Sequence, residues 1–182
     1  MDEHALIAAC LRGQGEEFGR IMDLYASPLM AMALNVLGNR EDAEDACQEA
    51  FVQAFRHLAR YDPARSFRTW LFTILFRRCL DVLKRRRRAR SLAAKAGAEP
   101  THRLYVEPAE SEGKRDLPRE LLRRLSPRER TALALWANEG FTAAEIADIV
   151  RCSPATARVY LFNARRKIKS LLENGHGTLG DR

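Results

Sequence analysis

Cysteine is scarce in this sequence, and the cysteines that it has lie far apart. There are four of them, Cys10, Cys47, Cys79 and Cys152. No Cys-x-x-Cys pair occurs, and no histidine lies near a cysteine at the spacing of metal ligands. The sequence therefore predicts neither a metal site nor a disulfide framework, and it offers no sign of a cofactor. Free thiols in a reducing cytosol are the expectation.

Long apolar runs are also absent. No run reaches the roughly 18 residues that a membrane-spanning helix needs. The N-terminus, MDEHALIAAC, is acidic and lacks the basic start and apolar core of a secretory signal. We therefore expect a cytoplasmic protein that does not act at a membrane.

The residue clusters that mark most enzymes are missing as well. The histidines, at positions 4, 57, 102 and 176, are scattered, and no glycine-rich loop for cradling phosphate is present. The sequence does not predict an enzyme.

No segment shows the alternation of apolar and polar residues that is typical of strands, so the chain is predicted to be all-α. Helices are expected within residues 3–12, 15–37, 40–60 and 66–90. Gly38 and Asn39 end the second of these, and Asn39 can cap the third. One apolar stripe follows the third helix: Ala43, Cys47, Ala50, Phe51, Ala54 and Leu58.

Residues 91–117 lose this periodicity and collect glycine, proline and scattered charge. The sequence therefore predicts two small helical domains, 1–90 and 118–175, joined by a flexible linker over 91–117. In the second domain, the Ser126 and Thr142 segments both have the form of a capping box.

The end of the second domain has the pattern of a helix-turn-helix. A short amphipathic helix after Thr142 is followed by a turn at Arg151 and Cys152, and Ser153 and Pro154 begin a longer helix. Its apolar stripe consists of Ala157, Leu161, Ala164, Ile168 and Leu171. A basic face lies opposite, which favours DNA binding through the second helix over an ordinary helical hairpin with solvated arginines. The candidate DNA contacts are Ser153, Thr156, Arg158, Val159, Phe162, Asn163 and Arg166.

Charge is distributed unevenly. The net charge of +7 favours a polyanionic partner. Residues 1–60 carry five Lys or Arg against ten Asp or Glu, whereas residues 61–95 carry eleven against two. This asymmetry indicates separate surfaces for separate partners.

The helix over 66–90 combines a wide apolar arc with a strip that holds Trp70, Thr73, Arg77 and Lys84. A tryptophan among cations is typical of a platform on which an unpaired base stacks. The alternative is that Trp70 packs at the edge of the core. A membrane-surface helix is disfavoured, because the wide arc needs other helices around it. The tract Lys84, Arg85, Arg86, Arg87 and Arg88 is expected to neutralise phosphates.

With these elements in hand, the sequence resembles the extracytoplasmic-function (ECF) sigma factors, the small promoter-specificity subunits of bacterial RNA polymerase. "NREDAEDACQEAFVQAFRHL" is similar to the family's polymerase-binding helix, and "FRTWLFTI" with "LDVLKRRRR" to its promoter-melting helix. The segment from "LPRELLRRLSPRER" to "ARVYLFNARRKI" is similar to its reader of the upstream promoter element.

The resemblance implies the following roles. The acidic face of Asp42, Asp45, Gln48 and Glu49 would bind core RNA polymerase, and the basic helix would bind promoter DNA. An anti-sigma factor is a further implied partner. Arg77 stands where the family usually has asparagine, and Val159, Tyr160 and Asn163 stand where serine and arginines are common. The resemblance therefore implies no particular promoter sequence.

A second hypothesis is a helix-turn-helix regulator that binds duplex DNA without polymerase. The acidic helix and Trp70 argue against it, since a reader of duplex DNA needs neither.

Overall fold

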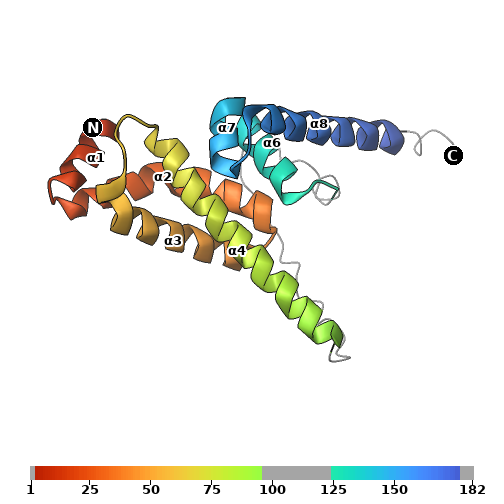
Figure 1. Ribbon diagram of the computed structural model, residues 1–182, viewed down its shortest axis with the longest axis horizontal. Helices are drawn as coiled ribbons and strands as arrows, with labels where there is room; N and C mark the ends of the chain where they lie inside the picture. The colour runs from red at the N-terminus through yellow and green to blue at the C-terminus, as the bar shows by residue number, and fades with distance from the viewer. Residues whose placement is uncertain (1–2, 96–123, 177–182) are drawn as a thin grey trace. The chain divides into compact units, whose positions relative to one another are not determined.

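The computed structural model describes residues 3–95 and 124–176, and all regular elements in these ranges are helical (Figure 1). The first part of the chain contains α1 (Glu3–Leu11), η1 (Gly15–Glu17), α2 (Phe18–Leu37), α3 (Arg40–His57), η2 (Leu58–Arg60) and α4 (Phe67–Lys95). The second contains α6 (Pro127–Glu139), α7 (Ala143–Val150) and α8 (Pro154–His176). The predicted all-α class is confirmed. The chain divides into two compact units, which are described separately.

The turn between α2 and α3 follows from two residues. Gly38 has a φ of 65°, a left-handed conformation that glycine adopts without strain, and its N–H donates to the Leu34 carbonyl. Asn39 is extended, and its side chain accepts a hydrogen bond of 2.8 Å from the backbone N–H of Asp42. This cap satisfies one of the free N–H groups at the start of α3.

The core of the first unit lies between α2, α3 and α4, each of which packs against the other two. The predicted stripe on α3, from Ala43 to Leu58, is buried throughout. From α4, the rings of Phe67, Phe72 and Phe76 are among the largest fully buried side chains. Helix α1 packs on α2, where the Tyr25 hydroxyl donates to the Glu3 carboxylate. The burial of three α4 phenylalanines fixes which side of α4 is left for a partner.

Helix α4 is longer than the sequence predicts. It continues to Lys95, so residues 91–95, which the sequence assigns to the linker, are helical. The physical reason is composition: Ser-Leu-Ala-Ala-Lys contains no helix breaker, and leucine, alanine and lysine favour helix. The first glycine after the basic tract is Gly97. The rest of the predicted linker, 96–117, and the predicted domain start at 118 lie outside the described residues.

In the second unit, α6, α7 and α8 pack against one another. Both predicted capping boxes are present, with Ser126 paired to Glu129 and Thr142 paired to Glu145. The turn between α7 and α8 is made by Arg151, which has a φ of 56° without being glycine. The predicted stripe of α8 faces inward: Ala157, Leu161 and Ala164 are buried, and Ile168 and Leu171 are partly buried.

The cysteines are all free, as the sequence predicts. Cys47 and Cys79 are buried in the first unit, and burial raises the pKa of both thiols to about 12. Cys10 and Cys152 are only half-buried. None of the described helices is both long and apolar enough to span a bilayer.

Candidate polymerase and nucleic-acid interfaces

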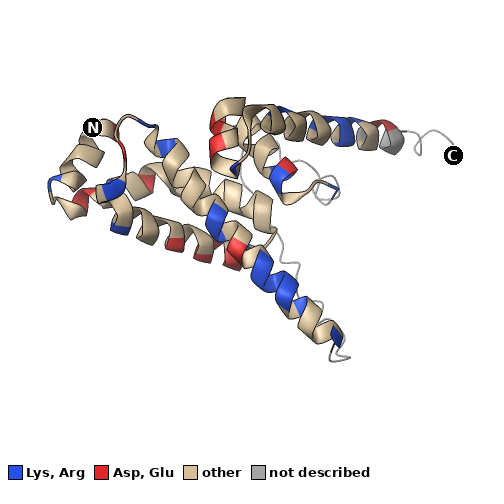
Figure 2. Cartoon of the chain, viewed as in Figure 1, with Lys and Arg blue, Asp and Glu red and all other residues tan. Residues whose placement is uncertain are grey.

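The acidic face predicted on α3 is present, although one of its four residues is used within the fold. Asp45, Gln48 and Glu49 are exposed. Asp42 is half-buried and forms an ion pair with Arg86 of α4. Glu49 pairs with Arg78 of α4 at 3.0 Å, but both side chains remain partly exposed. Figure 2 shows acidic residues gathered in the first half of α3.

Arg86 does not face outward with the rest of the basic tract. Its side chain is only 14% exposed. Its guanidinium donates a hydrogen bond of 2.9 Å to the Leu37 carbonyl at the end of α2 and pairs with Asp42 at the start of α3. Burial and the neighbouring Arg90 lower the pKa of Arg86, but an arginine keeps its charge at neutral pH. The sequence placed Arg86 among the phosphate contacts. In the structure, Arg86 instead connects α4 to the end of α2 and the start of α3.

The remaining cations of the tract face solvent. Arg85, Arg87 and Arg88 are exposed, as is Lys84, whose ammonium lies 3.6 Å from Asp81. Basic residues occupy much of the distal half of α4 in Figure 2. Exposed pairs of this kind contribute little to stability, so Lys84 can exchange Asp81 for a phosphate.

Trp70 lies at the edge of an aromatic cluster and is half-buried. Its ring centroid is 5.3 Å from that of Tyr61 and 5.4 Å from that of Phe67, and Tyr25 contacts Phe67 in turn. The core packing that the sequence left as an alternative is therefore real on one side of the ring. Part of the side chain remains accessible, and base stacking stays a prediction.

Two further residues of the predicted strip lie C-terminal to Trp70 on α4. Thr73 is half-buried, and its hydroxyl donates to the Thr69 carbonyl at 2.7 Å. Arg77 is exposed. Leu75 and Phe76, which precede Arg77, are buried and cannot reach a base.

The predicted contacts on α8 fall into two groups. Ser153 caps the helix, accepting from the Thr156 backbone N–H at 3.1 Å, and its hydroxyl also lies 2.9 Å from that of Thr156. Arg158, Val159, Phe162 and Arg166 are exposed along the helix, whereas Asn163 is half-buried. The exposed group is the part of α8 that can enter a groove.

One aromatic–cation pair in the second unit was not predicted from the sequence. The guanidinium of Arg165 lies 3.9 Å from the centroid of the Trp136 ring on α6, which is itself 44% exposed. An arginine stacked at this distance is held in place by the ring's electron density. No spacing rule connects residues on different helices, so sequence reasoning had no signal for this pair.

Lys167 is also used within the fold. Its ammonium donates to both oxygens of Glu129, at 2.8 and 2.9 Å. Burial alone would raise the pKa of Glu129, but the hydrogen bonds from Lys167 and Ser126 outweigh it, and the pKa is lowered. Lys167 therefore connects α8 to α6.

Residues 21–89 match Sigma-70 region 2, and residues 118–168 match Sigma-70, region 4. The chain is 31% identical to the ECF RNA polymerase sigma factor EcfG of Rhodopseudomonas palustris, over 79% of this chain and 78% of that protein. This chain belongs to the ECF sigma factors of the sigma-70 family.

Other relatives agree with this assignment. The sigma factor is 23% identical to the ECF RNA polymerase sigma factor SigW of Bacillus subtilis, over 90% of this chain and 92% of that protein. Among solved structures, it resembles the sigma factor RpoE in complex with the anti-sigma factor NepR from Bartonella quintana. The TM-score is 0.69 and the identity 26%, over 87% of this chain and 98% of that one.

The two matched regions coincide with the two surfaces described above. Region 2 covers most of α2, all of α3 and most of α4, and region 4 includes α6, α7 and the exposed face of α8. Helix α1 precedes the matched residues, so its packing on α2 is a feature of this sigma factor outside both regions.

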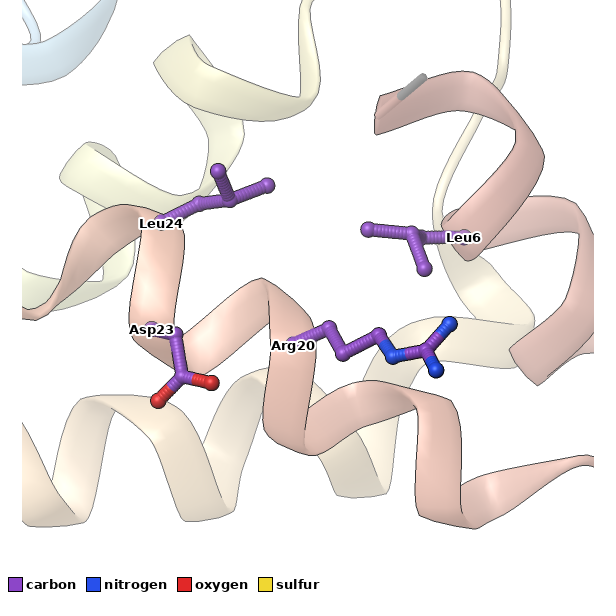
Figure 3. A pocket seen from close by; sticks show the side chains of 4 residues that line it. All are labelled: Leu6, Arg20, Asp23 and Leu24. Carbon is purple, nitrogen blue, oxygen red and sulfur yellow. The ribbon is translucent and has the colours of Figure 1, made fainter. Parts of the chain in front are cut away.

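A surface pocket of about 360 Å³ lies where α1 meets α2 (Figure 3). It is lined by Leu6, Arg20, Asp23 and Leu24, with the two leucine side chains facing each other across it. Among the described residues, no group of His, Cys, Asp and Glu side chains is arranged to hold a metal ion.

Proposed function

We propose that this sigma factor binds core RNA polymerase through α3 and directs it to a two-part promoter, whose elements are contacted by α4 and α8. The observation that carries this proposal is the separation of charge within one small unit. Three exposed acidic residues, Glu41, Asp45 and Glu49, lie on α3, and a run of exposed basic residues, Lys84, Arg85, Arg87 and Arg88, lies on the distal part of α4 (Figure 2). Two surfaces of opposite charge allow one unit to bind a protein partner and DNA at the same time.

The polymerase-binding residues are Asp45, Gln48 and Glu49. They project from α3 opposite its buried stripe, so a partner can contact them without disturbing the core. Glu49 exchanges its exposed pairing with Arg78 for a group on polymerase. Asp42 supports this surface indirectly, by fixing the start of α3 to Arg86.

The promoter-opening residues lie on α4. Trp70 is held by Tyr61 and Phe67 with part of its ring exposed, which pre-orients it to stack on an unpaired base. Thr73 and Arg77 lie on the following turns. Lys84, Arg85, Arg87 and Arg88 then contact phosphates and add a sequence-independent, salt-sensitive attraction.

The upstream element is read by α8. Ser153 and Thr156 order its first turn, which is the part of a recognition helix that reaches base edges. Arg158 is exposed one turn later and can bind a guanine or a phosphate. Arg166 contacts the backbone further along the helix. Asn163 lies beside this face.

The sigma factor has no catalysis of its own in this proposal and acts in the cytoplasm, where its polymerase is found. The RpoE–NepR complex is a precedent for an anti-sigma partner, and we extend that kind of partner to this chain.

The test is a pull-down of core polymerase with the full chain. Asp45→Arg combined with Glu49→Arg should abolish association with core, because two attractive charges become repulsive. The matched control is Glu16→Arg with Asp23→Arg, which makes the same change in net charge at exposed positions outside α3. Equal binding by the two double variants would refute the assignment of α3. Duplex binding by a wild-type chain that captures no core would favour the regulator hypothesis instead.

A further inference from the structure

The exposed face of α8 has an apolar middle, which is unexpected for a surface that meets a polyanion. Val159 is 52% exposed and Phe162 is 62% exposed. Exposing two large apolar side chains one turn apart is unfavourable unless a partner covers them. Within the described part of the second unit, Trp136 is the other large apolar side chain exposed to this degree, and it is already stacked with Arg165.

Helix geometry shows how apolar and basic groups share this face. Successive residues are rotated by about 100°. Relative to Phe162, Ala155 is displaced by about 20° and Val159 by about 60°, whereas Arg158 and Arg165 lie about 40° and 60° to the other side. Arg166 lies about 40° away, on the side of Val159. The face therefore carries an apolar strip with Arg158 and Arg165 along one edge, while Arg166 projects between Phe162 and Val159 one turn further along the helix.

Ring contacts hold two of these arginines in position. The guanidinium of Arg166 lies 5.8 Å from the Phe162 ring centroid, and that of Arg165 lies 3.9 Å from the Trp136 ring. Phe162 therefore has two functions on this surface, since it occupies the middle of the face and orients the guanidinium of Arg166.

This arrangement matches the major groove of duplex DNA. Phosphates border the groove, where Arg158, Arg165 and Arg166 can bind them. Val159 and Phe162 can neither donate nor accept a hydrogen bond, so at their positions the polar base edges cannot be read. The apolar group that the groove does offer is the 5-methyl group of thymine.

The two polar neighbours do not supply a replacement. Asn163 is half-buried, and the Tyr160 hydroxyl lies 3.4 Å from the guanidinium of Arg128 on α6. In this segment of α8, discrimination between bases therefore falls to Arg158 and to the apolar pair.

We propose that Val159 and Phe162 recognise the 5-methyl groups of thymines in two adjacent base pairs of the upstream promoter element. The residues are separated by about 4.5 Å along the helix axis. This is close to one base-pair step of about 3.4 Å, which is why the pairs are adjacent. The inference rests on the proposed function, because it assigns a base feature to the helix that reads the upstream element.

The test uses holoenzyme assembled from core polymerase and the full chain. Selection from random duplexes first identifies the upstream element, and each thymine in it is then replaced by deoxyuridine, which removes the methyl group and keeps every hydrogen bond. Affinity should fall by about fourfold at each of two adjacent positions, the effect of exposing one buried methyl group. Changing thymine to cytosine should weaken binding further, and 5-methylcytosine should recover part of that loss.

Variants connect the effect to the residues. Val159→Ala and Phe162→Ala should weaken binding to the thymine duplex, and each should abolish the response to deoxyuridine at one position. Both side chains are exposed, so truncation leaves no cavity in the core. Leu24→Ala, which truncates a side chain that is 54% exposed on α2, is the matched control and should respond to deoxyuridine as the wild type does.

The outcomes separate this inference from the proposed function. Holoenzyme that selects a promoter but tolerates deoxyuridine at every position overturns the thymine assignment alone. Variants that lose affinity for core polymerase and keep their DNA affinity also overturn it, since the face then binds protein. A wild-type chain that forms no promoter-selective holoenzyme refutes the proposed function itself.

Discussion

Arg86 provides a sharp test of its role in the fold, because its substitution should lower stability whereas substitution of the neighbouring arginines should weaken DNA binding. Arg86→Ala removes a hydrogen bond to the Leu37 carbonyl and an ion pair with Asp42. Hydrogen bonds to a charged group contribute about 1.5–3 kcal/mol each. Asp42 is about one-third exposed, so water replaces part of its interaction. We therefore expect a loss of about 2–3 kcal/mol in total.

For a unit of this size, such a loss lowers the unfolding midpoint by at least about 8 °C. Alanine has a higher helix propensity than arginine, so a lowered midpoint cannot result from a weaker intrinsic helix propensity of α4. The chain has two tryptophans, one in each unit. In a Trp136→Phe background, Trp70 fluorescence reports unfolding of the first unit only. Asp42→Ala combined with Arg86→Ala should destabilise by less than the sum of the two single changes.

Arg88→Ala is the matched control, since Arg88 is exposed and two residues away. It should leave the midpoint almost unchanged and reduce the salt dependence of DNA binding by about 0.7–0.9 in log–log slope. Arg86→Ala should leave that slope unaltered once the protein is folded. An unchanged midpoint for Arg86→Ala, together with a weaker salt dependence of DNA binding, would show that Arg86 is a phosphate contact. Its contacts with Leu37 and Asp42 would then have no energetic role.

Three further predictions follow from other contacts. Trp70→Ala should destabilise the open complex by about 1–3 kcal/mol without weakening recruitment to duplex promoter DNA. A pre-melted promoter should restore open-complex formation by this variant. A variant that is only less stable, with normal transcription, would show that Trp70 has a role in the core alone. Glu129→Gln should lower the stability of the second unit at neutral pH but not in acid. The depressed pKa of Glu129 gives stability that is present above its ordinary value of 4.5 and is lost as pH falls, so thermal midpoints of both proteins across pH 3–7 should converge. Arg151→Gly should raise the free energy of unfolding of the second unit by about 0.5–1 kcal/mol, measured by Trp136 fluorescence, because it relieves a φ of 56°. Arg151→Val should lower this free energy.

The features that sequence predicted correctly are those with local causes. The caps at Asn39, Ser126 and Thr142 depend on residues within one helical turn, and all three were recognised from spacing alone. The buried stripe of α3 follows from helical periodicity in the same way. The predicted end of α4 is five residues too early, because the loss of apolar periodicity after residue 90 indicates a linker, although residues 91–95 contain no helix breaker.

The features that sequence missed depend on contacts between distant segments. Arg86 and Leu37 are 49 residues apart, and Trp136 and Arg165 lie on different helices. In the sequence, Arg86 is indistinguishable from the arginines on either side of it. Only the packing of α4 across the α2–α3 turn determines which of them is turned inward.

The continuity of α4 has a consequence for the DNA that it contacts. No glycine or proline interrupts the helix between Trp70 and Arg88, and α4 is one unbroken helix in Figure 1. These residues are separated by five complete turns, or about 27 Å, and therefore project from the same side. In the proposed function, a base that stacks on Trp70 and a phosphate that binds Arg88 are thus kept at a fixed separation, equivalent to about eight steps of a duplex. In this proposal the length of α4 between Trp70 and Arg88 sets the distance from the first unpaired base to the nearest bound phosphate.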